Sequence, residues 1–190
     1  MRPVETPPDI LDAAENVLQI MQRHRIDAVV IGAVALAAHR YVRQTEDLDM
    51  AVNADLEHLR LLAATLNTEG YRASLHEPDA QDALGGVIDV EGPFGVLQII
   101  SYAGKFPAVI EDALREAKMS VRAGSPLKLV PLPHLVALKL YAGGMKSKAD
   151  VVEVLLRNPD ADLDAMRRLC ASYRLAGLEE LIDEAKSQAS

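Results

Sequence analysis

The segment from Ala28 to Asn53 constrains the fold of this chain more than any other. The apolar run Ala28–Ile31 predicts a short buried strand, and Gly32 ends it. Small and apolar residues from Ala33 to Ala38 predict a tightly packed helix that starts directly after Gly32. Acidic and apolar residues then alternate from Asp47 to Asn53, which predicts a strand with one acidic and one apolar face.

The rest of the chain adds both helices and strands, in no regular order. Helical periodicity predicts a helix after Asp9 and further helices over residues 56–66, 107–118, 132–142, 149–156, 163–173 and 178–185. Strands are predicted over residues 71–76, 87–91, 96–100 and 127–130. We therefore expect an α+β fold, with a small mixed β-sheet, helices packed on it and a helical C-terminal third. Residues 1–125 would form the α+β core and residues 126–190 a helical part packed on that core, together one structural domain.

Composition and charge exclude several classes of protein. The chain of 190 residues has 20 Lys and Arg against 28 Asp and Glu, a net charge of −8, which argues against a broad basic surface for duplex DNA. No apolar stretch reaches the length of a membrane span, and the first residues lack the apolar run of a signal peptide. The single cysteine, Cys170, excludes a disulfide framework and a cysteine-based zinc site. We expect a cytoplasmic protein without a membrane role.

Two carboxylates on the alternating strand indicate a metal site. Asp47 and Asp49 are two residues apart on a strand, so both side chains point to one face, where their charges repel each other. A divalent cation relieves this repulsion, and carboxylate oxygens suit Mg²⁺ or Mn²⁺. Gly32 precedes a helix start, whose free N–H groups can bind phosphate. Metal and phosphate binding together would suit transfer from a nucleoside triphosphate (NTP).

Each of these features also has an ordinary structural explanation. Two acids on one face of a strand are usually a solvated surface. A strand followed by Gly and a helix is common in proteins that mix helices and strands. The ordered combination of these features carries more information than either feature alone.

This combination resembles the signature of the nucleotidyltransferase superfamily, which shares its fold with DNA polymerase beta. The matching residues are Gly32-Ala33, the Ala-rich helix and the segment Arg43-x-Thr45-x-Asp47-Leu48-Asp49. They look most like small bacterial members related to abortive-infection toxins. The later helical segment 135–140 and Asp150 also fit the order of the family.

The resemblance implies a role for each matched residue. Asp47 and Asp49 would hold the metal ions, and Gly32 and Ala33 would contact the nucleotide phosphates through their backbone groups.

Four further roles are implied, each with a structural alternative. Arg43 and Thr45 would brace the loop or the phosphates; a structural ion pair and a loop-bracing hydroxyl are the alternatives. Lys139 would approach the triphosphate or the acids, although a lysine in an apolar helix often only extends its amine to solvent. Asp150 would cap or support the neighbouring helix.

The chain departs from the family at its third catalytic carboxylate. The family places this acid on a later strand and uses it as general base, but here the matching residue is the neutral Gln98. Gly92 to Gly95 predict a hairpin centred between Pro93 and Phe94, which places Asp89 opposite Gln98 on the same face. We hypothesise that Asp89 replaces the missing acid. Ala33, in place of a second Gly or Ser, and Ser147, in place of an acid, are smaller departures.

Two functions from different classes follow. The first is a Mg²⁺- or Mn²⁺-dependent enzyme that moves a nucleoside monophosphate from NTP to a hydroxyl on a tRNA, a protein or a small molecule. The second is a catalytically degenerate protein of the same fold that binds a nucleotide or a small protein partner, for example in a toxin–antitoxin pair. Gln98 favours the second function.

Overall fold

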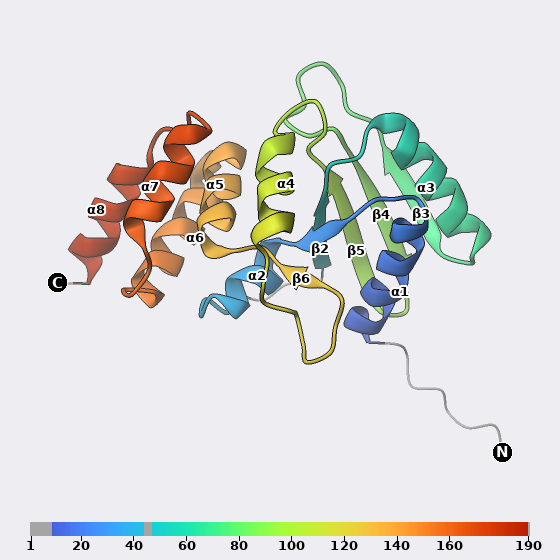
Figure 1. Cartoon of the computed structure of the whole chain (residues 1–190), viewed down its shortest axis with the longest axis horizontal. Helices are drawn as coiled ribbons and strands as arrows, with labels where there is room; N and C mark the ends of the chain where they lie inside the picture. Colours follow the sequence, from blue (N-terminus) through green and yellow to red (C-terminus); the bar gives the residue numbers. More distant parts are fainter. Residues whose placement is uncertain (1–8, 44–46, 190) are drawn as a thin grey trace.

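The computed structural model of the chain describes residues 9–43 and 47–189. Its helices are α1 (Ile10–Arg23), α2 (Gly32–Ala38), α3 (Leu56–Thr68), α4 (Pro107–Glu116), α5 (Leu132–Ala142), α6 (Gly144–Arg157), α7 (Leu163–Ser172) and α8 (Leu178–Gln188) (Figure 1). Its strands are β1 (Ala28–Val30), β2 (Asp47–Val52), β3 (Arg72–His76), β4 (Gly86–Gly92), β5 (Gly95–Ser101) and β6 (Lys128–Leu129). Within the described residues, no helix is both long and apolar enough to cross a membrane.

The strands form one mixed sheet in the order β3-β4-β5-β2-β1-β6. Strand β2 lies between β5, to which it is parallel, and β1, to which it is antiparallel. Strands β3, β4 and β5 form an antiparallel meander, and β6 lies parallel to β1 at one edge. The expected α+β fold with a small mixed sheet and a helical C-terminal third is confirmed.

The two faces of β2 differ, as its alternating sequence predicts. Leu48 and Met50 are fully buried, as are Leu97 and Ile99 on the neighbouring β5. Helices α1 and α3 cover the β3–β5 side of the sheet (Figure 1). Each such buried side chain stabilises the fold by roughly 1.5–3 kcal/mol. Asp47 and Asp49 alternate with these residues and therefore point to the other face.

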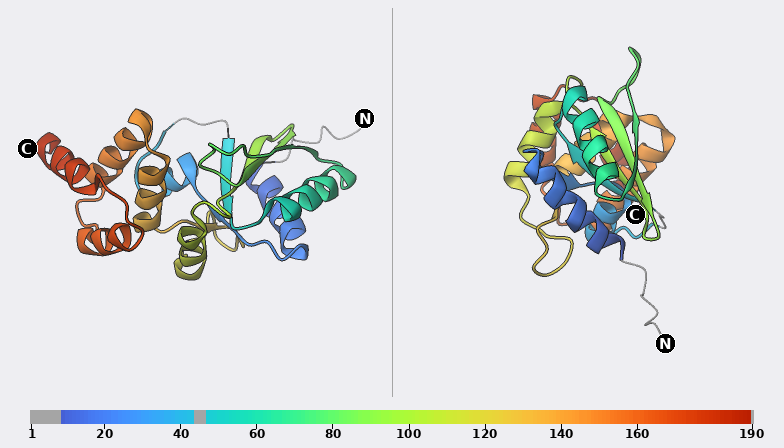
Figure 2. Two further views of the ribbon diagram at one scale, coloured as in Figure 1. Left: turned by 90° about the horizontal axis from the view of Figure 1, so that it is seen from above. Right: turned by 90° about the vertical axis from the view of Figure 1, so that its right-hand side faces the viewer.

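Helices α5 to α8 gather at one end of the molecule, away from α1 and α3 (Figure 2). A cluster of aromatic rings joins α5 and α7 to the start of α4: Phe106 stacks on Tyr141 at 4.6 Å between ring centroids and meets Tyr173 edge-on at 5.1 Å. The Tyr141 hydroxyl also donates a hydrogen bond to the carbonyl of Ala83, at 2.8 Å. Strand β6 pairs with β1, so residues after 126 contribute an edge strand to the sheet as well as the helices.

Helix α6 begins earlier than its apolar periodicity predicts. We expected this helix from residue 149, but it begins at Gly144, because Gly143 and Gly144 both adopt positive φ and reverse the chain at once after α5. Lys146 and Lys148 therefore lie in the first turns of α6. Asp150 lies within the helix, not at its start.

His134 is buried in α5 without a hydrogen-bond partner in the part of the chain that the structure describes. Its side chain is 1% exposed, and neither ring nitrogen is paired. Burial lowers the pKa of this imidazole, Glu116 raises it and Arg115 lowers it further. The folded protein therefore holds His134 in its neutral form.

This burial predicts a loss of stability in acid. Because the pKa of His134 is lower in the folded chain than its unfolded value of about 6.5, its contribution to stability is complete above that pH and is lost as the pH falls through the folded pKa. The loss should reach up to about 1.4 kcal/mol per pH unit. Urea unfolding between pH 7 and pH 5 measures it. His134→Leu should flatten this dependence, whereas His24→Leu should keep it; equal slopes in both variants would contradict the assignment.

Candidate functional site

Gly32 lies directly against the carboxylate of Asp49. The Ile31 N–H donates a 2.9 Å hydrogen bond to the Asp49 carbonyl, which holds the end of β1 beside β2. Gly32 then turns the chain into α2 with a φ of +66°, and a Cβ built on it would lie 1.9 Å from Asp49 Oδ2. The Asp49 carboxylate thus occupies the place that a side chain at position 32 would take. Any other residue at position 32 would displace this carboxylate.

Asp47 and Asp49 share the open face of β2, where they are half-buried. Burial raises the pKa of Asp49, and the charge of Asp47 raises it further. The positive charges of Lys139, Arg43 and Lys146 act in the opposite direction. The site therefore concentrates negative charge that burial and repulsion make costly, which favours a bound cation.

A row of polar side chains crosses the sheet from Asp49. In the register of the strands, Asp49 faces Gln98 on β5, and Gln98 faces Asp89 on β4, as the predicted hairpin requires. Gln98 Nε2 donates to Asp89 Oδ1 at 2.8 Å, and His76 Nε2 donates to Asp89 Oδ2 at 2.9 Å. Both oxygens of Asp89 are thus engaged by neighbouring side chains.

The described residues do not bring Asp89 into a metal cluster with the other acids. Within residues 9–43 and 47–189, no group of three or more His, Cys, Asp or Glu side chains is placed to hold a metal ion. The two acids of β2 share a face, whereas Asp89 accepts hydrogen bonds from Gln98 and His76. Its role as a replacement acid stays a prediction.

Lys139 and Asp150 form an ion pair between α5 and α6. Lys139 Nζ lies 2.7 Å from Asp150 Oδ2, and the two side chains are only 17% and 3% exposed. The pair fixes the amine of Lys139 near Asp49, whose pKa its charge lowers. Asp150 lies inside α6 and does not cap it; its carboxylate instead holds the lysine of the preceding helix.

The other predicted residues take different positions. Arg43 is half-buried; its charge acts on Asp49, and its Nε has no hydrogen-bond partner among the described residues. Ala33 is buried in the first turn of α2. Thr45 lies outside the described residues.

Sequence reasoning missed two neighbours of the acids. Burial raises the pKa of the Tyr102 hydroxyl, and the charge of Asp49 raises it further, so this buried ring lies close to the site. The sequence feature that could have indicated Tyr102 is its position directly after β5. In the sheet, the preceding residue, Ser101, pairs with Val52 of the acid-bearing strand β2. The charge of Lys146 also acts on Asp49; its sequence context indicated either a solvated lysine or, with Lys148, a small basic lip.

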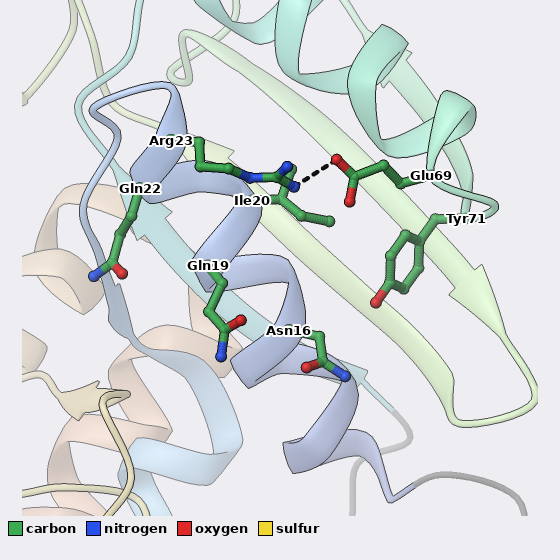
Figure 3. Close-up of a pocket in the computed structure, with 7 residues that line it drawn as sticks. All are labelled: Asn16, Gln19, Ile20, Gln22, Arg23, Glu69 and Tyr71. Carbon is green, nitrogen blue, oxygen red and sulfur yellow. Dashed lines mark hydrogen bonds and ion pairs between the residues drawn. The ribbon is translucent and has the colours of Figure 1, made fainter.

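A separate polar groove lies at α1 and at the connection from α3 to β3 (Figure 3). Its volume is about 710 Å³. The residues that line it are Asn16, Gln19, Ile20, Gln22, Arg23, Glu69 and Tyr71. An ion pair between Arg23 and Glu69, 2.5 Å long, spans the groove. None of the predicted site residues lines it.

The contact at Gly32 predicts that a side chain there lowers the stability of the protein, and a second glycine serves as the control. Gly104 has a similar φ of +69°, but no atom lies within 4 Å of the place that a Cβ would take there. Gly104→Ala should therefore lower the free energy of unfolding by only about 1–2 kcal/mol, the strain of a left-handed backbone. Gly32→Ala should lower it by about 1–3 kcal/mol more, because its Cβ clashes with Asp49. Urea unfolding measures both. Adding Asp49→Ala to Gly32→Ala should recover the excess; equal costs at the two glycines would show that the contact is not tight.

The buried ion pair predicts a second effect on stability. Asp150→Ala leaves the Lys139 amine largely buried without its partner and should lower the free energy of unfolding by about 3 kcal/mol. The double variant Lys139→Met/Asp150→Leu should recover most of this loss, because apolar side chains of similar volume fill the space. A loss below about 1 kcal/mol in chemical denaturation of Asp150→Ala would show that the pair is screened by solvent.

Comparison with known proteins agrees with this fold. No protein-family model and no curated protein sequence matches the chain. Among solved structures, the antibiotic-resistance factor ANT(2'')-Ia has a TM-score of 0.51 at 17% identity, over 86% of this chain and 90% of that chain. An antigenic nucleotidyltransferase-like protein from Paracoccidioides brasiliensis has a TM-score of 0.50 at 16% identity, over 82% and 79%. At such identities the likeness concerns the fold alone, which this chain shares with these two proteins.

Proposed function

We propose that this protein transfers a nucleoside monophosphate from an NTP to a hydroxyl acceptor and releases pyrophosphate. The observation that carries the proposal is the acid face of β2: Asp47 and Asp49 share it, and Asp49 packs against Gly32 at the turn from β1 into α2. The fold supports the same reaction class. The sequence resemblance to abortive-infection toxins stays a prediction.

Asp47 and Asp49 fit a divalent cation by their chemistry. Two carboxylates on one strand face offer the hard oxygen ligands that Mg²⁺ and Mn²⁺ prefer, and burial already makes the charge of Asp49 costly. Such a cation, when bound, would neutralise charge on the triphosphate and on the reacting oxygens. We assign Asp47 and Asp49 as its ligands.

The phosphates would be bound by groups around the acid pair. The first N–H groups of α2, at Gly32 and Ala33, have no partner within the helix and can donate to phosphate oxygens. Arg43 and Lys139 add positive charge on the same side, since both act on Asp49. Lys139 is held in place by Asp150.

The acceptor is a hydroxyl on a protein, a small molecule or a tRNA. The net charge of −8 disfavours an extended RNA surface and so favours the first two classes. A cytoplasmic location fits the single cysteine, Cys170, which is a free and buried thiol.

A second function is favoured by Gln98. A neutral amide faces Asp49 where the family has its third acid, and Asp89 is engaged by Gln98 and His76. A protein with this site could bind Mg²⁺ and NTP without turnover and serve as a binding partner in a toxin–antitoxin pair.

Nucleotide binding and pyrophosphate release test the two functions. With Mg²⁺ and NTP, the protein should show a raised melting temperature and, with an acceptor, released pyrophosphate. Asp47→Asn/Asp49→Asn should abolish both effects while leaving the cation-free protein as stable or more so, because two repelling charges are removed.

A control pair of exposed acids calibrates this result. Glu57→Gln/Asp183→Asn removes the same charge on exposed helix surfaces and should leave both effects unchanged. Unaltered Mg²⁺·NTP binding in the Asp47/Asp49 variant would contradict the proposed site. Binding without pyrophosphate from any acceptor would select the second function.

A further inference from the structure

Gln98 occupies the position between two carboxylates on the open face of the sheet. Strand β5 lies between β4 and β2, and in the register of the strands Gln98 is the partner of Asp89 on one side and of Asp49 on the other. Neighbouring strands lie about 4.8 Å apart, and partners in register share one face of the sheet. The amide of Gln98 therefore lies within side-chain reach of both acids.

The chemistry of Asp89 determines which way this amide faces. An ionised carboxylate only accepts hydrogen bonds, so the group of Gln98 that meets Asp89 Oδ1 at 2.8 Å must be the NH₂ donor. The amide is planar, and its nitrogen is committed to the β4 side. Its carbonyl oxygen, Oε1, points in a different direction from this nitrogen, because the two atoms diverge from one planar carbon.

His76 holds Asp89 in this orientation. His76 Nε2 donates to Asp89 Oδ2 at 2.9 Å from the outer strand β3, while Gln98 donates to the other oxygen. The Asp89 side chain is 26% exposed, and it lies on β4 between two paired strands. The carboxylate is thus fixed from both sides.

We propose that Gln98 supplies a neutral oxygen ligand beside Asp49 in the cation site, and that Asp89 is the positioning residue that turns this oxygen toward the site. This inference rests on the proposed function. Amide oxygens are accepted ligands of hard divalent cations. A third carboxylate at this position would add to the repulsion between Asp47 and Asp49, whereas a neutral oxygen does not.

Binding of Mn²⁺ alone, followed by electron paramagnetic resonance, tests the proposal without any acceptor or turnover. Gln98→Leu should weaken Mn²⁺ binding about tenfold or more, since it removes a ligand, and Asp89→Leu should weaken it to a similar extent, since it frees the amide. Gln98→Asp should bind Mn²⁺ more tightly than the parent. Glu91→Leu removes an equal charge two residues along the same strand and should change the affinity less than about twofold.

The double variant separates positioning from direct binding. If Asp89 acts through Gln98, then Gln98→Leu/Asp89→Leu should bind Mn²⁺ no more weakly than Gln98→Leu alone. If the double variant instead lost Mn²⁺ affinity beyond Gln98→Leu, by as much again as Asp89→Leu loses alone, Asp89 would be a ligand itself and the positioning role would be overturned. An affinity unchanged by Gln98→Leu would overturn the ligand role.

The same titrations distinguish this inference from the proposed function. Loss of Mn²⁺ binding in Asp47→Asn/Asp49→Asn, together with no effect of Gln98→Leu, would overturn the inference and leave the proposed function standing. An absence of saturable Mn²⁺ binding in the parent protein would overturn both.

Discussion

The contact between Gly32 and the Asp49 carboxylate couples the turn after β1 to the acid-bearing strand β2. The backbone hydrogen bond from Ile31 to Asp49 sets the spacing of the two strands, and the missing side chain at position 32 lets the carboxylate lie against the start of α2. The acids, the helix start and the cationic side chains around them all take their places relative to this contact.

This arrangement costs stability in the absence of a cation. Burial and the charge of Asp47 raise the pKa of Asp49 above its unfolded value of about 3.9, so its contribution to stability is complete below that pH and is lost as the pH rises through the folded pKa. Once ionised, Asp49 therefore destabilises the cation-free fold. Sites of this kind are typical of places where a protein gives up stability for function.

Much of the fold could be predicted from the sequence because it depends on local patterns. Helix α5 has the predicted bounds. The hairpin predicted from Gly92 to Gly95 correctly places Asp89 opposite Gln98. The alternation along β2 correctly separated its buried face from its acidic face. These features depend on hydrophobic periodicity and on turn geometry, which neighbouring residues determine.

The contacts inside the site could not be predicted in the same way. The place of Asp49 against Gly32, the two hydrogen bonds of Asp89 and the burial of His134 are set by packing between elements that are distant in sequence. The early start of α6 depends on two glycines with positive φ, a geometry that periodicity does not record. The ion pair of Lys139 with Asp150 joins α5 to α6 and depends on how these two helices pack.

The most direct test of the proposed cation site is a crystal structure with Mn²⁺ and a non-hydrolysable NTP, in which anomalous scattering locates the metal. We expect an anomalous peak about 2.1 Å from carboxylate oxygens of both Asp47 and Asp49, with the triphosphate beside Gly32 and Lys139. A nucleotide bound elsewhere, such as in the polar groove beside α1, with no metal on these two carboxylates, would contradict the assignment.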